Sequence, residues 1–159
     1  MSSVILPGSY DPVTVGHLEI IKRAAALYDE VYVVAFVNPK KNYTFSVEER
    51  VKMLILATDE LENVLVSYSG GYVIDYMREH GIEKIVKGYR NDEDLKWERE
   101  QAEYNLKNGG YETELWLCQD EMKDVSSTAV RELLKSGKSA SDLLPEAVEN
   151  YIKSLERFQ

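Results

Sequence analysis

Apolar residues form five short runs along the chain, at residues 4–6, 31–37, 64–67, 84–87 and 114–118, and each run predicts a strand. The run at 31–37 (VYVVAFV) consists almost entirely of β-branched and aromatic residues. Such a run is typical of a strand that is buried on both faces, as in a parallel sheet.

Helices are predicted between these strands. Leu18, Ile21 and Ala25 recur at helical spacing and predict a helix over about 15–28. Ser46 and Glu49 have the spacing of a capping box, which opens a helix over 46–61. Further helices are predicted over about 72–80, 92–106, 126–137 and 145–157.

Strands that alternate with helices predict βαβ units. We find no linker, composition shift or internal repeat. The expected fold class is therefore α/β, with residues 1–159 in a single doubly wound, Rossmann-like domain. Its five-stranded sheet should be mainly parallel and carry helices on both faces.

Composition and charge exclude several classes of protein. The chain has no apolar run near the ~18 residues of a transmembrane helix, and no secretory signal is expected at its start. The one cysteine, Cys118, indicates a cytoplasmic location and should be a small apolar residue within a strand. The net charge of −9 argues against nucleic acid and membrane partners, unless positive groups gather locally.

Basic and hydroxyl residues follow four of the five predicted strands. In doubly wound sheets a ligand binds beyond the carboxyl ends of the strands, so these residues should meet there. Together with helix N-termini they suit a polyanion such as a nucleoside triphosphate. The alternative is chance, since loops are polar in any case. The residues are Ser9, His17, Lys40, Lys41, Lys87, Arg90, Lys123, Ser126, Ser127 and Thr128.

The first loop, PGSYDPVTVGH at residues 7–17, is the most specific feature. Gly8 permits a close backbone approach or a positive φ. Gly16 would let a ligand lie against the first helical turn, from which His17 projects. In the alternative reading, Asp11 is a capping residue and His17 is a solvated helix residue. That alternative suits a lone histidine better than it suits the whole string.

The segment TVGH at residues 14–17 resembles the (T/H)xGH motif of the nucleotidyltransferase superfamily. Nearly the whole chain is similar to bacterial phosphopantetheine adenylyltransferases, with four later segments in family order and at family spacing. These are NPKK with FSVEER at 38–41 and 45–50, KGYR at 87–90 followed by Asp94 and Glu98, VSST at 125–128, and LP at 144–145.

This resemblance implies transfer of the adenylyl group of ATP to 4′-phosphopantetheine, giving dephospho-coenzyme A and pyrophosphate, the penultimate step of coenzyme A biosynthesis. The nucleophile is a phosphate that is already anionic, so positioning and electrostatic stabilisation can supply the catalysis without a covalent intermediate. The resemblance also implies Mg²⁺, held by ATP phosphates and water and not by a protein cage. It further implies a homohexamer.

The resemblance assigns roles to individual residues. The catalytic residues would be His17 and Lys41. The ATP-binding residues would be Ser9, Tyr10, His17, Gly88, Tyr89, Arg90, Glu98, Met122, Lys123, Asp124, Val125, Ser126, Ser127 and Thr128. The phosphopantetheine-binding residues would be Ser9, Lys41, Val73 and Lys87. Lys87 stands where the family usually has arginine, and a lysine cannot grip phosphate in a bidentate manner.

Two other functions stay open from the sequence. A sister cytidylyltransferase acting on glycerol 3-phosphate would usually carry an RTxGISTT segment, where this chain has KDVSST at 123–128. A nucleotide-binding sensor without catalytic activity could use the same fold. The set of Ser9, His17 and Lys41 argues against the sensor.

Overall fold

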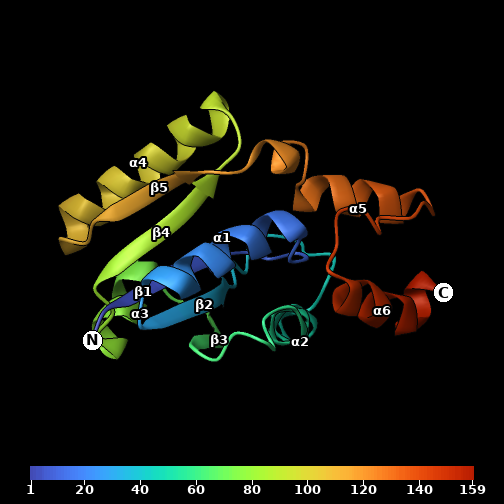
Figure 1. Cartoon of the computed structure of the whole chain (residues 1–159), viewed down its shortest axis with the longest axis horizontal. Coiled ribbons are helices and arrows are strands. Elements are labelled where there is room, and N and C mark those ends of the chain that lie inside the picture. Colours follow the sequence, from blue (N-terminus) through green and yellow to red (C-terminus); the bar gives the residue numbers. More distant parts are fainter.

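The sheet of this protein is parallel throughout. The computed structural model describes residues 1–159 and contains five strands in the order β3-β2-β1-β4-β5 (Figure 1). All four neighbouring pairs run parallel, so the sheet is all-parallel and not only mainly so. The strands are β1 (Ser3–Gly8), β2 (Glu30–Phe36), β3 (Val64–Ser69), β4 (Lys84–Tyr89) and β5 (Thr113–Leu117). The order reverses between β1 and β4, which makes their carboxyl ends the expected ligand position.

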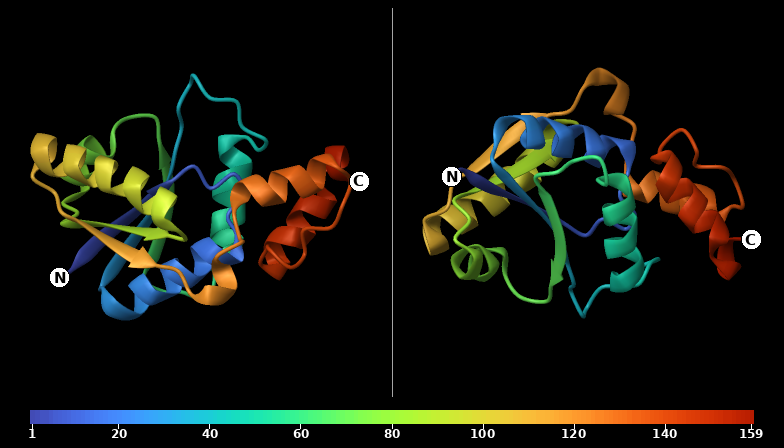
Figure 2. Two further views of the ribbon diagram at one scale, coloured as in Figure 1. Left: turned by 90° about the horizontal axis from the view of Figure 1, so that it is seen from above. Right: turned by 60° about the horizontal axis from the view of Figure 1, so that its bottom comes forward.

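Six helices accompany this sheet, of which the first four connect its strands. They are α1 (Val15–Leu27), α2 (Val47–Ala57), α3 (Val73–His80), α4 (Asp92–Gly109), α5 (Ser127–Lys135) and α6 (Glu146–Ser154), with 3₁₀ turns at Asp120–Met122 and Glu156–Phe158. Helices α5 and α6 stand beyond the carboxyl end of the sheet (Figure 2). None of the helices combines the length and the apolar character that crossing a membrane requires.

The two faces of the sheet bury different helices. Alternate residues of a strand point to opposite faces, so Val4 and Leu6 face one side and Ile5 faces the other. The first side packs against α1 and α2, and the same core continues into buried residues of α5 and α6. The second side packs against α3, including Met77 and Ile82 after it. The expected helices on both faces are thus confirmed.

Some element ends differ from the prediction for local reasons. Helix α2 stops at Ala57, because the backbone of the C-cap residue Thr58 leaves the helical conformation, with φ −110° and ψ 11°. Helix α4 runs on to Gly109, where Gly110 ends it with a left-handed φ of 74°. The expected last helix is divided, because the chain is extended at Leu155 between α6 and the final 3₁₀ turn.

Candidate active site

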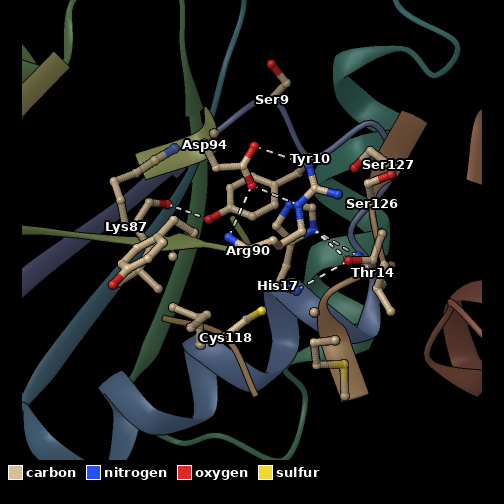
Figure 3. A pocket seen from close by; sticks show the side chains of 18 of the residues that line it. Ser9, Tyr10, Thr14, His17, Lys87, Arg90, Asp94, Cys118, Ser126 and Ser127 are labelled. Carbon is tan, nitrogen blue, oxygen red and sulfur yellow. Dashed lines mark hydrogen bonds and ion pairs between the residues drawn. The ribbon is translucent and has the colours of Figure 1, made fainter. Parts of the chain in front are cut away.

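A cavity of about 370 Å³ lies at the carboxyl ends of β1 and β4. Its 25 lining residues come from these two strand ends, the β1–α1 loop, the first turns of α1 and α4, and the segment from Cys118 to Arg131 (Figure 3). The volume falls within the roughly 300–1,000 Å³ of small-molecule sites. The cavity therefore occupies the place where a doubly wound sheet binds its ligand.

The first wall of the cavity is the turn after β1. Tyr10 has a φ of 51°, and its hydroxyl donates to the Leu6 carbonyl at 2.8 Å, so the side chain folds back over the strand end. A Cβ on Gly8 would lie 3.1 Å from the Tyr10 ring, which explains glycine there by close approach and not by a positive φ. Burial, and secondly the charge of Glu98, raise the pKa of the Tyr10 phenol, which stays protonated.

His17 is held in one tautomer by the start of α1. Thr14 is the N-cap residue, and its backbone N–H donates to His17 Nδ1 at 3.0 Å. The accepting Nδ1 leaves the proton on Nε2. The imidazole also packs edge-on against the Tyr10 ring, with centroids 4.9 Å apart. His17 therefore lines the cavity as part of a capping box and is not a solvated helix residue.

The imidazole of His17 is neutral at neutral pH. Burial, and then the positive charges of Lys87 and Arg90, lower its pKa to about 4. A neutral ring with its proton on Nε2 donates a hydrogen bond and carries no charge of its own. It can therefore stabilise charge that develops on a bound group.

Two cations reach the cavity from β4 and the residue after it, and each is paired with a carboxylate of α4. Lys87 Nζ donates to the Pro7 carbonyl at 3.1 Å and lies 3.3 Å from Glu98 Oε2. Arg90 Nε lies 2.9 Å from Asp94 Oδ2. Asp94 and Glu98 are four residues apart, so they lie on the same face of α4. This face points to the cavity and forms both ion pairs.

The third wall is the N-terminus of α5. Ser126 caps the helix by accepting from the Ala129 N–H at 3.0 Å, and the Ser127 hydroxyl donates to the Pro12 carbonyl at 2.8 Å. The N–H groups of Ser127 and Thr128 have no acceptor within the chain. Free N–H groups at a helix N-terminus favour an anion such as phosphate.

Most of the seventeen residues to which the resemblance assigned roles lie together in this cavity, although four do not line it. The thirteen that line it are Ser9, Tyr10, His17, Lys87, Gly88, Tyr89, Arg90, Glu98, Met122, Val125, Ser126, Ser127 and Thr128. Lys41 is exposed in the β2–α2 loop, and Val73 begins α3 and packs against the second face of the sheet. Lys123 pairs with Asp120 at 3.1 Å, and neighbouring Asp124 is exposed.

Sequence reasoning missed three features of the site. Arg131 lines the cavity and donates to the Asp11 carbonyl at 2.9 Å and to Thr128 Oγ1 at 3.1 Å. Its position three residues after Thr128 was a usable signal, because both then share a helix face. Cys118 lies just past β5 and faces the cavity. Burial, followed by the charge of Glu19, raises the pKa of its thiol.

Asp11 is the third of these features. It does not cap α1, since Thr14 does. Its carboxylate is buried and accepts from the N–H groups of Thr44 and Phe45 at 3.0 and 2.9 Å. Asp11 thereby ties the β1–α1 loop to the β2–α2 loop.

The donor set of the chain does not form a metal cage. No group of three or more His, Cys, Asp or Glu side chains is placed to hold an ion. The two carboxylates of α4 that face the cavity, Asp94 and Glu98, already pair with cations. These residues therefore do not fit a site in which the protein itself supplies most ligands of Mg²⁺.

Comparison with known proteins shows the family of the chain. Residues 5–133 match the model of the cytidylyltransferase-like family. The chain is also 41% identical over 150 residues to the phosphopantetheine adenylyltransferase of Corynebacterium efficiens, with 94% of each chain covered. The protein therefore belongs to the cytidylyltransferase-like family of nucleotidyltransferases. Within that family it is a member of the phosphopantetheine adenylyltransferase group.

Proposed function

We propose that the protein transfers the adenylyl group of ATP to 4′-phosphopantetheine, releasing pyrophosphate and forming dephospho-coenzyme A. The relative of 41% identity supports this substrate pair over CTP and glycerol 3-phosphate. The observation that carries the proposal is the neutral His17, whose Nδ1 is occupied by the Thr14 N–H inside a cavity with Lys87 and Arg90. Nε2–H is then the donor available to a reacting phosphate.

The proposed reaction is a direct in-line displacement. A phosphate oxygen of phosphopantetheine forms a bond to the α-phosphorus of ATP, while the bond from that phosphorus to the bridging oxygen breaks. Pyrophosphate leaves with the electron pair, and no proton has to be removed from the nucleophile. Positioning and charge stabilisation then supply the rate enhancement.

The chain's residues divide this work. His17 donates from Nε2 to the charge that develops on the α-phosphate, and Lys41 adds a positive charge beside it. Lys41 takes part in no ion pair and lies in the exposed 38–42 segment, so it is free to turn toward bound ATP. Mg²⁺ would enter with the ATP phosphates and reduce their charge. No step is assigned to protein ligands of the metal.

We assign ATP to the wall formed by Ser9, Tyr10, residues 88–90, Glu98 and residues 122–128. Phosphopantetheine would contact Ser9, Lys41, Val73 and Lys87. We further propose a cytoplasmic homohexamer. The exposed apolar side chains of Leu65 and Tyr68 on the edge strand β3 support assembly of copies.

Release of pyrophosphate in a coupled assay tests the proposal. ATP with phosphopantetheine should give turnover, whereas ATP alone should give none. Turnover with CTP and glycerol 3-phosphate in place of these substrates would identify the sister cytidylyltransferase. Binding of ATP without pyrophosphate release from any pair would identify a sensor. Light scattering of the same preparation measures the size of the assembly.

A further inference from the structure

The largest fully buried side chain in the molecule is a cation without a carboxylate partner. Arg50, in the first turns of α2, is 1% exposed and takes part in no ion pair. Its Nε has no hydrogen-bond acceptor. Burying an unpaired charge is costly, so the contacts that this guanidinium does make need a reason.

The main contact of Arg50 is with the turn after β1. Its guanidinium donates to the Ser9 carbonyl at 2.8 Å and approaches the Phe36 carbonyl at 3.5 Å. The peptide between Ser9 and Tyr10 is trans, because the only cis bond is Asp11–Pro12. In a planar trans peptide the C=O and the N–H point in opposite directions. The Tyr10 N–H therefore points away from Arg50.

That N–H is free within the protein. No hydrogen bond from the Tyr10 or Ser9 backbone N–H is present, although both residues line the cavity. Tyr10 also has a left-handed φ of 51°. Successive N–H groups beside a left-handed residue form concave anion sites. The orientation of this one peptide thus decides whether the turn presents the Tyr10 N–H or the Ser9 carbonyl to a phosphate.

Arg50 supports the second loop of the site as well. Its guanidinium lies 3.9 Å from the centre of the Tyr43 ring, and the Tyr43 hydroxyl accepts from the Asn38 N–H at 2.9 Å. The bond between Asn38 and Tyr43 closes the base of the segment that carries Lys41. One buried guanidinium therefore contacts both loops from which the proposed phosphate donors come.

We propose that Arg50 is a positioning residue for adenylyl transfer: it holds the Ser9–Tyr10 peptide with the Tyr10 N–H toward the phosphates and fixes the base of the Lys41 loop. This inference rests on the proposed function. In a purely structural role, Arg50 would only link α2 to β2 through the Phe36 carbonyl. Two variants of equally lowered stability distinguish these roles. A positioning role predicts that kcat falls only when Arg50 is the residue replaced.

The test compares Arg50→Lys and Arg50→Met with Met53→Ala. Met53 is fully buried one turn further along α2 and makes no side-chain hydrogen bond to either loop. All three variants should lower the melting temperature. Loss of one preorganised donor costs on the order of 10²–10³ in kcat, and we expect about 10²-fold for Arg50→Met. KM for ATP should change by less than about threefold, since most phosphate contacts stay in place.

Arg50→Lys should lie between the wild type and Arg50→Met, because lysine keeps the charge but not the flat, forked donor. Met53→Ala should keep wild-type kcat. If Arg50→Met is folded and retains kcat, or if Met53→Ala loses as much, the positioning role is wrong. If Arg50→Met does not fold, Arg50→Lys decides in the same way.

A second readout does not depend on turnover. In protein labelled with ¹⁵N-tyrosine, the Tyr10 amide is assigned by its loss in Tyr10→Phe. ATP should shift this amide in the wild type and in Met53→Ala, but not in Arg50→Met at saturating ATP. A wild-type protein without adenylyl transfer would overturn the proposed function, whereas an equal amide response in Arg50→Met would overturn this inference.

Discussion

The segments that follow β1 and β2 each lead to a proposed catalytic residue, His17 in the first turn of α1 and Lys41 in the β2–α2 loop, yet they are built in opposite ways. In the first, Tyr10, Asp11 and Thr14 are buried, and His17 is fixed by a hydrogen bond to the Thr14 N–H. In the second, residues 38–42 are all exposed. The first loop is preorganised, so its donor needs little rearrangement during the reaction. The second must lose side-chain freedom when Lys41 meets its ligand.

The two loops differ at their tips and share a rigid base. The Thr44 and Phe45 N–H groups bind Asp11 of the first loop, and Arg157 at the C-terminus donates to the Thr44 carbonyl at 3.2 Å. Arg157 also pairs with Glu49 at 2.5 Å. The segment around Lys41 is held by bonds within itself, such as that from the Lys41 N–H to the Asn38 carbonyl at 3.0 Å, and its side chains stay exposed. We infer that a preorganised donor and a mobile one serve the same phosphate.

Removing the fixed donor should have the largest effect. We expect His17→Ala to lower kcat by on the order of 10²–10³, because its hydrogen bond is strongest in the transition state. ATP affinity and the melting temperature should stay close to wild type. Steady-state kinetics, calorimetric titration with ATP and thermal melting measure the three quantities. Turnover near the wild-type rate in a folded variant would leave His17 with its role in the capping box of α1 and no role in catalysis.

Removing the mobile donor should have the next largest effect. Lys41→Ala should lower kcat by on the order of 10–10², since a flexible lysine contributes less than a fixed donor. Lys40→Ala is the matched control in the same exposed segment and should be mild. Equal losses would show that the loop supplies diffuse positive charge. A larger loss for Lys40→Ala would show that the two lysines have exchanged roles.

Breaking the link between the loops should mainly lower stability. Asn in place of Asp11 keeps one acceptor but leaves one buried backbone N–H without a partner. Such a group costs about 1–3 kcal/mol. Urea unfolding of Asp11→Asn should show this loss, whereas Asp59→Asn, at an exposed position after α2, should stay within about 0.5 kcal/mol of wild type. If Asp11→Asn were as stable as the wild type, the hydrogen bonds of Asp11 to the second loop would not stabilise the fold.

These differences explain what the sequence could and could not predict. All five strands and six helices follow from local runs, caps and spacing, and so does the glycine-rich turn with His17. Asp11, Arg50 and Arg131 act through partners 33 to 120 residues away. No local pattern encodes these long-range contacts, although the spacing of Thr128 and Arg131 places both on one face of α5. The order of the strands depends on how the connecting helices cross the sheet, which local runs do not specify. The capping box of α2 likewise does not specify the direction of the Lys41 side chain.

The smallest expected effect concerns the protonation of His17. In the folded protein its pKa is lowered to about 4, against an ordinary value of 6.5 in the unfolded chain. Above pH 6.5 the ring is neutral in both states and contributes nothing to the pH dependence. Between pH 6.5 and 4 the unfolded chain takes up a proton that the native state does not, so the free energy of unfolding falls as the pH falls. Below pH 4 both states are protonated and the fall stops.

This contribution should disappear when the ring is replaced. Urea unfolding at pH 7, 6 and 5 should show a shallower loss of stability for His17→Asn than for the wild type. The chain has only two histidines, so NMR resolves His17 directly once His80→Gln has assigned the other signal. We expect its midpoint near pH 4 in the free protein and a higher midpoint with ATP, whose phosphates stabilise the charged ring. A midpoint near 6.5 without ATP would mean that the ring is solvated, and that the loop after β1 is no more preorganised than the loop after β2.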